Sequence, residues 1–457
     1  MEITGNTLIE LGYKPGKWFG KAIEEANRIG FSNKEELIEY VNTVVPPEPL
    51  KPFSNPVKYY KNIEAGTEDE LFNMGQVFKT MDEVMKTPTV VSGAIMPDAC
   101  PAGSVGQIPV GGVVATRNAI HPAMHSADIC CSVMATNLGK VDPKEVLDKA
   151  HQITHFGIGG RKEFSFIPSQ LQAGMKQNKF LKSEKAQELS ITHTGTQGDG
   201  NHFLFVGVSE LTGDTYMVTH HGSRGLGAYL YKYGLKVAER YRKELSPKTL
   251  KCNAWIPYDT EDGKEYWAAL QYVREWTKHN HMVLHDTVNN AINDGKPVKN
   301  NFWNEHNFVF KEGDLFYHAK GATPLLDSFV PDSMEGLRLI PLNMSEPVLV
   351  VKGSLSENNL GFAPHGAGRN MSRVAHKRLK EGVSNEDIFN EETRGIDARF
   401  FSGKMDISEL PSAYKNADEV VKQIEKFGLG EVVDKIQPYG CIMAGHIDYP
   451  WTKNKNK

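Results

Sequence analysis

The chain has 457 residues, of which 40% are hydrophobic and 24% are charged, so it can bury a substantial core, and the fibrous and disordered classes are excluded. Fifty-two lysines and arginines against 56 aspartates and glutamates give a formal net charge of −4, so a nucleic-acid partner would need a local basic surface. Five scattered cysteines do not suit a disulfide framework, so we expect thiols or metal ligands.

The N-terminal sequence is not typical of a signal peptide. Residues 1–4 lack a basic region followed by an apolar one. No window of the chain approaches the run of about 18 apolar residues that a membrane span requires. We therefore expect a cytoplasmic protein with no membrane partner.

The first part of the chain predicts helices and then strands. Residues 1–87 are expected to form a helical and loop segment, in which 34–41 has helical spacing and the prolines within 46–49 stop any continuation. Short apolar runs with glycine and proline between them follow over 89–138, for example at 110–116. This pattern predicts buried strands.

The second part of the chain predicts long helices. Residues 230–295 are expected to be mostly helical, with the clearest periodicity over 266–285. Residues 412–434 predict a terminal helical stretch, and the apolar run 441–443 follows it. The mixture of elements indicates an α+β fold.

The chain shows no sustained repeat and no linker that separates two large domains. We therefore expect one large domain over 88–450, preceded by the helical and loop segment 1–87. A polar, solvated tail over 451–457 is expected to follow it.

His365 is the most informative residue of the chain. It lies in the segment Pro-His-Gly-Ala-Gly-Arg at 364–369. The small neighbours leave its ring approachable, and Arg369 could hold a phosphate in a fork of donors. Together they indicate covalent nucleotide chemistry, and the alternative is a core-facing histidine beside a glycine-rich turn.

Five residues elsewhere have the chemistry of metal ligands, namely Asp128, Cys131, His202, His220 and His306. One carboxylate, one thiolate and three imidazoles suffice for a two-metal site if the thiolate bridges. Ligand softness favours zinc and leaves manganese and iron open. Taken one at a time, the alternative is that Cys131 is a small buried side chain and His306 a structural histidine.

Two glycine-rich segments could bind phosphate. Residues 195–203 include Asn201 and lead into an apolar run, and residues 219–227 place Arg224 between glycines. Backbone amides and a guanidinium in such segments can face phosphate oxygens. Ordinary tight turns are the alternative for both.

These motifs, in this order, resemble the RtcB family of RNA-splicing and RNA-repair ligases. The similarity runs from about Met96 to Gly445, and a series of motifs in one order is more specific than any single motif. The segments that carry it are Asp128–Cys131, Gly200–Phe203, His220–Gly225, Glu305–Asn307 and His365–Arg369.

The resemblance implies that 88–450 is an RtcB-like catalytic domain with a mixed β core around a two-metal site. The ions would be two manganese ions, with zinc as a substitute. By the resemblance, the thiolate of Cys131 bridges the two ions, with Asp128 and His202 on one side and His220 and His306 on the other.

The resemblance also implies a reaction. His365 would attack the α-phosphate of GTP to give a histidine–GMP intermediate, the GMP would pass to an RNA 3′-phosphate, and a 5′-hydroxyl would displace it. An opened 2′,3′-cyclic phosphate would supply the 3′-phosphate, in RNA repair or tRNA splicing. The implied nucleotide- and phosphate-binding residues are Asn201, Arg224, Asn343, Gly366, Ala367, Gly368, Arg369 and Tyr414.

RNA with these ends is the implied partner, and an activating protein of the archease type is a further candidate. Two other classes stay open: a metal-dependent phosphoesterase or nucleotidyl hydrolase, and a noncatalytic RNA-end sensor. Retention of His365 and Arg369 argues against the hydrolase, and a sensor would be expected to lose metal ligands or the nucleophile first.

The chain departs from the family pattern where the nucleobase is expected. Pro341–Ser345 replaces a Pro-Gly-Ser-Met-Gly segment, Val348 replaces a serine, Phe205 an acidic residue and Ala444 a lysine. Loss of buried hydrogen-bonding groups relaxes discrimination between ligands. We therefore predict normal metal binding with an altered nucleotide preference or affinity.

Overall fold

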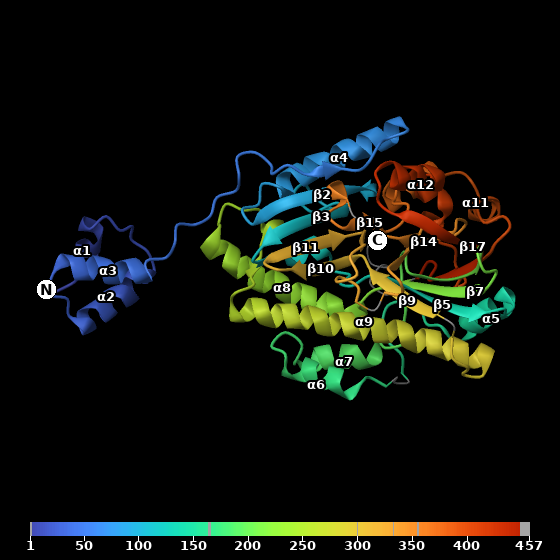
Figure 1. The fold of residues 1–457 in the computed structure, drawn as a ribbon, viewed down its shortest axis with the longest axis horizontal. Helices are drawn as coiled ribbons and strands as arrows, with labels where there is room; N and C mark the ends of the chain where they lie inside the picture. The colour runs from blue at the N-terminus through green and yellow to red at the C-terminus, as the bar shows by residue number, and fades with distance from the viewer. Residues whose placement is uncertain (1, 163–165, 299, 332, 354–355, 448–457) are drawn as a thin grey trace. The chain divides into compact units, whose positions relative to one another are not determined.

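The computed structural model describes residues 2–162, 166–298, 300–331, 333–353 and 356–447 (Figure 1). The expected tail at 451–457 lies outside these residues. The chain forms two compact units: Met1–Leu50 with Glu244–Pro247 makes the smaller one, and Lys51–Lys243 with Lys248–Lys457 makes the larger one.

The smaller unit contains three helices, α1 (Gly5–Glu10), α2 (Trp18–Ile29) and α3 (Lys34–Val44). They enclose a core that includes Leu8, Phe19 and Leu37. The side chain of Asn33 caps α3 by accepting a hydrogen bond from the Glu36 backbone N–H. The helix predicted from residue 34 is therefore confirmed, and it ends before the prolines that follow it.

In the larger unit, helices connect many of the strands along the chain. They are α4 (Glu68–Val84), α5 (Pro143–Ile153), α6 (Ser169–Gln177), α7 (Glu184–Thr192), α8 (Arg224–Leu245), α9 (Glu261–Asn293), α10 (Arg373–Leu379), α11 (Asn385–Glu392) and α12 (Ala417–Lys426). Helices α8 and α9 confirm the mostly helical stretch predicted over 230–295. The helix predicted over 412–434 is wrong in part, because it is confined to α12 and a strand begins at Glu431. Gly428 and Gly430 separate the two, both at positive φ, which glycine adopts readily.

A five-stranded sheet has the order β1-β2-β3-β11-β10. Its strands are β1 (Tyr60–Lys61), β2 (Val90–Cys100), β3 (Val110–Arg117), β11 (Leu315–Lys320) and β10 (Asn307–Glu312). Strands β2 and β3 confirm the buried strands expected after residue 89. Strand β1 pairs in parallel with β2, and the pairs β2–β3, β3–β11 and β10–β11 are antiparallel.

A second sheet has the order β13-β14-β17-β6-β7-β5-β9. Its strands are β13 (Leu337–Pro341), β14 (Val348–Lys352), β17 (Glu431–Met443), β6 (Phe203–Ser209), β7 (Thr215–His221), β5 (Ser132–Gly139) and β9 (Asn300–Glu305), and β16 (Asp397–Phe400) pairs with β17. The side chain of Asn304 on β9 donates to Leu339 O at 3.2 Å and accepts from Leu339 N at 2.7 Å on β13. This amide joins the first and last strands, so the sheet is nearly closed and the α+β prediction is confirmed.

Helix α9 packs against the strands that lead to the functional residues. Two of its histidines, His281 and His285, each place a ring nitrogen 2.7 Å from Thr219 Oγ1 on β7. Their other ring nitrogens lie 3.0 Å from Ser132 Oγ and 2.7 Å from Thr136 Oγ1 on β5. These buried hydrogen bonds fix β5 and β7 relative to the helix.

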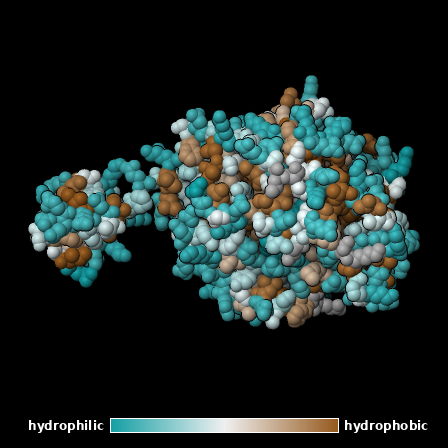
Figure 2. All heavy atoms as spheres, in the orientation of Figure 1, coloured by the Kyte–Doolittle hydropathy of each residue, from teal (hydrophilic) through white to brown (hydrophobic). Residues whose placement is uncertain are grey.

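Two pairs of short strands complete the larger unit: β4 (Ala119–Ile120) with β8 (Ile256–Pro257), and β12 (Ala322–Pro324) with β15 (Phe362–Pro364). On the face drawn in Figure 2, hydrophobic residues are scattered among hydrophilic ones. Among the described residues, no helix combines the length and apolar character that a membrane span requires.

Candidate active site

A tight turn before β5 presents Asp128 and Cys131. The Cys131 N–H donates to Asp128 O at 3.2 Å, and Cys130 between them adopts a left-handed φ of 57°. The turn is held to the neighbouring chain, because Cys130 N donates to Asn307 O at 2.7 Å and His306 N donates to Cys131 O at 2.8 Å. Asp128 and Cys131 are thereby fixed beside the end of β9.

The three histidines come from the ends of adjacent strands. His202 precedes β6, His220 lies near the end of β7, and His306 follows β9. The register places His220 opposite Phe203, the residue after His202. Residues far apart in the sequence therefore meet where these adjacent strands begin or end.

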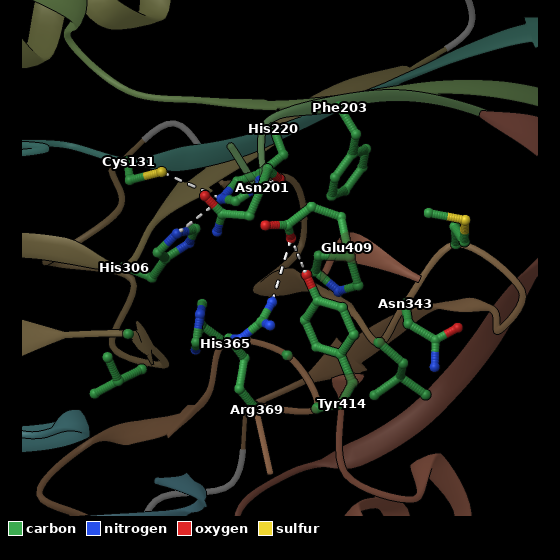
Figure 3. Close-up of a pocket in the computed structure, with 18 of the residues that line it drawn as sticks. Cys131, Asn201, Phe203, His220, His306, Asn343, His365, Arg369, Glu409 and Tyr414 are labelled. Atoms are coloured by element: carbon green, nitrogen blue, oxygen red, sulfur yellow. Dashed lines mark hydrogen bonds and ion pairs between the residues drawn. The ribbon is translucent and has the colours of Figure 1, made fainter. Parts of the chain in front are cut away.

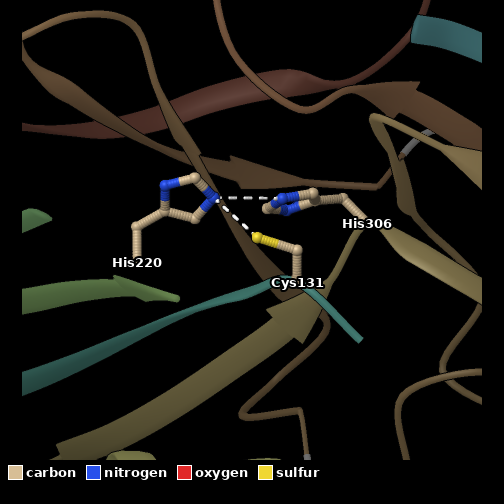
Figure 4. A group of neighbouring side chains, drawn as sticks. All are labelled: Cys131, His220 and His306. Carbon is tan, nitrogen blue, oxygen red and sulfur yellow. Dashed lines mark hydrogen bonds between the residues drawn. The ribbon is translucent and has the colours of Figure 1, made fainter. Parts of the chain in front are cut away.

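The side chains form two candidate metal-ligand groups, which share Cys131. In the first, His220 Nε2 lies 3.2 Å from Cys131 Sγ and 3.2 Å from His306 Nε2 (Figure 4). In the second, His202 Nε2 lies 3.1 Å from Asp128 Oδ2 and 3.8 Å from Cys131 Sγ. Within each group the ligand atoms all lie within 4.8 Å of one another.

This donor set fits metal ions. The Nδ1 atoms of His202 and His220 lie 2.6 Å from Gln197 O and 3.0 Å from Asn201 O, so each Nδ1–H donates to a carbonyl and Nε2 carries the free lone pair. Burial lowers the pKa of His220 to about 3, which keeps its imidazole neutral. Burial, and then the Asp128 carboxylate, raise the pKa of the Cys131 thiol well above its usual value, and a bound cation would reverse this by stabilising the thiolate.

His365 follows the short strand β15 and is oriented by Asp98 on β2. Its Nδ1 lies 2.5 Å from Asp98 Oδ2, and its backbone N–H donates to the same oxygen at 3.0 Å. Its ring centroid lies 4.8 Å from that of His306. The Nδ1–H is therefore engaged, and Nε2 is left for chemistry next to the metal-ligand group.

The backbone at position 368 lies so close to the backbone of Asp98 that only glycine fits there. It has a φ of 74°, and a Cβ added there would lie 2.0 Å from Asp98 O. No other residue type fits without moving the carbonyl. The loop after His365 thus stays in contact with the strand that carries Asp98.

One cavity of about 410 Å³ joins the metal-ligand groups to this loop (Figure 3). Most residues predicted for the site line it: Asp128, Cys131, Asn201, His220, His306, Asn343, His365, Gly366, Ala367, Gly368, Arg369 and Tyr414. His202 is not among the lining residues and contacts Asp128.

Arg224 lies outside the cavity lining. Its Nη2 donates to Gly157 O at 2.8 Å and its Nε donates to Thr196 Oγ1 at 3.2 Å. Its guanidinium also packs beneath Gly198, where an added Cβ would lie 1.9 Å from Nη1. These contacts brace the glycine-rich segment that carries Asn201, and a contact of Arg224 with phosphate stays a prediction.

The sequence motifs do not predict a place in the site for Asp98 or Glu409. Glu409 is buried and accepts from Arg373 Nε at 2.5 Å, from Tyr414 Oη at 2.7 Å and from Arg369 Nη1 at 3.5 Å. The guanidinium of Arg369 also lies 5.3 Å from the centroid of the Tyr414 ring. A carboxylate within an apolar strand could have drawn attention to Asp98, whereas nothing local distinguishes Glu409.

Known proteins match most of the chain. A family model described as tRNA-splicing ligase RtcB matches residues 140–444. The tRNA-splicing ligase RtcB of Pyrococcus abyssi is 28% identical over 301 residues, which cover 56% of this chain and 32% of that protein. The protein of the same name from Archaeoglobus fulgidus is 27% identical over 310 residues, covering 56% and 61%.

A eukaryotic relative aligns over more of the chain. The RNA-splicing ligase RtcB homolog 1 of Entamoeba dispar is 25% identical over 435 residues, which cover 77% of this chain and 78% of that protein. The aligned part of the chain therefore spans 32% and 61% of the two archaeal relatives and 78% of the eukaryotic one.

Proposed function

The chain belongs to the RtcB family, and on that premise we propose that it is an RNA ligase that joins 3′-phosphate or 2′,3′-cyclic phosphate ends to 5′-hydroxyl ends through a histidine–GMP intermediate. RNA with these ends is the proposed substrate, in tRNA splicing or RNA repair. The observation that carries the proposal is the position of His365, held by Asp98 and beside the metal ligand His306 in one cavity.

The proposal gives the chain's own atoms the following roles in the first step. With Nδ1–H donating to Asp98, the lone pair of His365 lies on Nε2, which attacks the α-phosphorus of GTP as pyrophosphate leaves. The Asp98 carboxylate stabilises the positive charge that develops on the ring. The backbone of Gly366–Gly368 and the side chain of Asn201 line the cavity, where they would orient phosphate oxygens.

The remaining steps use the same nucleophile as a leaving group. Water first opens a 2′,3′-cyclic phosphate at its bond to the 2′ oxygen and gives the 3′-phosphate. An oxygen of the RNA 3′-phosphate takes the GMP from His365 Nε2, and a 5′-hydroxyl then attacks the activated 3′-phosphate and displaces GMP. Asp128, Cys131, His202, His220 and His306 would hold the metal ions, which we propose are two manganese ions, with zinc as a substitute. When bound, such ions neutralise crowded phosphate charge.

The test separates nucleotide transfer from strand joining. The full chain with Mn²⁺ and α-³²P-GTP should acquire an acid-labile label, and His365→Ala should abolish it. His151→Ala, a histidine on α5 outside the cavity lining, is the matched control and should label normally. Mixed oligonucleotides with 3′-phosphate and 5′-hydroxyl ends should then be joined.

Two outcomes would contradict the ligase. Hydrolysis of phosphate esters without label on His365 would favour a metal-dependent phosphoesterase or nucleotidyl hydrolase. Binding of RNA ends without any nucleotide turnover, with or without an activating protein of the archease type, would favour an RNA-end sensor.

A further inference from the structure

The cavity continues along β6 away from the metal-ligand groups. Phe203 lies opposite His220 on the neighbouring strand, with ring centroids 5.2 Å apart. Phe205 is the next residue on the same face of β6, about 6.7 Å further on. If the α-phosphate lies at His365, as the proposed function requires, the nucleobase must lie toward Phe205.

This end of the cavity is apolar. Phe203 and Phe205 pair with Met443 and Cys441 on β17, and all four line the cavity. Leu342, Asn343 and Met344, in the segment after β13, also line the cavity. The apolar residues that line this end are Phe205, Leu342, Met344, Val348, Cys441 and Met443, and each is at least nine-tenths buried.

Polar side chains line the cavity as well, among them Glu409 and Asn343, and both already make hydrogen bonds within the protein. Both carboxylate oxygens of Glu409 are engaged, Oε1 by Arg373 and Oε2 by Tyr414 and Arg369. Asn343 Oδ1 accepts from Ser345 N at 2.9 Å. The amide N–H groups of Asn343 remain and could donate to N7, an acceptor that guanine and adenine share.

We infer that this base subsite selects a purine by shape and stacking and does not distinguish guanine from adenine, so that ATP is a second nucleotide substrate beside GTP. The inference rests on the proposed function, which sets the orientation of the nucleotide. The step is unchanged: His365 Nε2 forms a bond to the α-phosphorus of ATP, the bond to pyrophosphate breaks, and pyrophosphate leaves.

The magnitudes favour weak discrimination. A site built to hydrogen-bond a ligand group rejects analogues that lack it by about 10⁴-fold or more, whereas an apolar pocket discriminates by about 100-fold at most. The side chains of the six apolar residues at this end of the cavity offer no hydrogen-bond partner to guanine N1–H, N2–H or O6, so these groups bring little gain over adenine there.

Equilibrium binding tests the inference without catalysis. The His365→Ala protein, full length and with Mn²⁺, is titrated with GTP, ATP and CTP in competition with a fluorescent GTP analogue. We expect the Kd values for GTP and ATP to agree within about tenfold, with CTP weaker because a smaller base stacks less. Binding of GTP at least 100-fold tighter than ATP, or no binding of either purine, would overturn the inference.

A substitution at Phe205 tests the location of the base edge. Phe205→Glu would supply a carboxylate that accepts from guanine N1–H and N2–H, and it should raise the preference for GTP over ATP at least tenfold. Phe205→Leu is the matched apolar control and should leave the ratio unchanged. An unchanged ratio in folded Phe205→Glu would overturn the assignment of Phe205 to the base edge. If Phe205→Glu does not fold, the titration of His365→Ala with GTP, ATP and CTP still decides whether the base subsite distinguishes guanine from adenine.

Failure of the proposed function would look different. If both purines bind equally but neither labels His365 in the wild-type chain, the ligase mechanism is wrong and the base subsite stands. If GTP alone both binds and labels His365, the ligase mechanism stands and the base inference is wrong.

Discussion

A single oxygen of Asp98 accepts two hydrogen bonds from His365, one from Nδ1 at 2.5 Å and one from the backbone N–H at 3.0 Å. The side chain of Asp98 is buried on β2, and that of His365 is 18% exposed. One carboxylate therefore fixes both the backbone and the ring of the proposed nucleophile. Such an arrangement selects the tautomer with the proton on Nδ1.

Asp98→Asn should slow nucleotidyl transfer while nucleotide binding persists. The amide keeps the shape of the carboxylate but not its charge, so it no longer stabilises the imidazolium, and a loss of about 10²-fold or more in rate is expected. Single-turnover labelling of His365 measures the rate, and competition titration measures the Kd for GTP. Asp69→Asn, an exposed carboxylate on α4, is the control, and equal labelling rates in the two variants would refute the role of Asp98.

Substitution of single metal ligands should show which of the two groups each ligand serves. Cys131 belongs to both, so Cys131→Ala should lower manganese affinity at both sites, by more than about a hundredfold. Asp128 belongs to one, so Asp128→Asn should weaken one site and leave the other occupied. Metal content after gel filtration at fixed Mn²⁺ measures this. Cys252→Ala, a thiol outside both groups, should retain the wild-type content, and full content in Cys131→Ala would rule out a shared thiolate.

Much of the candidate site was predictable because its proposed metal ligands adjoin strands in short motifs. His220 and His306 each lie at a strand end, next to residues that mark the motif, and His365 lies among glycines. The contacts of Asp98 and Glu409 were not predictable. Asp98 meets His365 across 267 positions of the chain, and the β17 strand after α12 is fixed by pairing with β14 and β6 rather than by local pattern.

Acid should destabilise the fold through buried neutral histidines such as His121. Its Nε2 lies 2.8 Å from Thr89 Oγ1, its Nδ1 lies 3.1 Å from Asn253 O, and burial lowers its pKa to about 3. In the unfolded chain the histidine has a pKa of about 6.5, so at acid pH it binds a proton that the buried histidine of the folded chain does not bind. The stabilisation is therefore present above about pH 6.5 and is lost as pH falls toward 3, by about 1.4 kcal/mol per histidine between pH 7.5 and 5.5.

The matched variant for this effect is His121→Gln, which keeps a donor and an acceptor but does not titrate. Urea denaturation at pH 7.5 and 5.5 gives the change in unfolding free energy for each protein. The decrease should be about 1.4 kcal/mol smaller in the variant than in the wild type. Equal decreases in both proteins would show that His121 does not contribute.

Glu409→Gln should weaken nucleotide binding without affecting metal binding. The buried carboxylate holds two guanidinium groups and the Tyr414 hydroxyl on one side of the cavity, and burial raises the pKa of Tyr414, which keeps its hydroxyl a donor. A neutral amide leaves Arg369 and Arg373 to repel each other, so the ring of Tyr414 loses its fixed position. Loss of hydrogen bonds to a charged group should lower the unfolding free energy by about 1.5–3 kcal/mol.

The decisive measurement for Glu409 is the Kd of each purine nucleotide. It should rise about tenfold, because Arg369 and Tyr414 are no longer held in position before the nucleotide binds. Manganese content should stay at the wild-type value, because Glu409 belongs to neither metal-ligand group. Glu419→Gln, an exposed carboxylate on α12, is the control for the change in charge. If Glu409→Gln binds GTP and ATP as the control does, then Glu409 supports only the fold, and the base is held by the apolar residues around Phe205 alone.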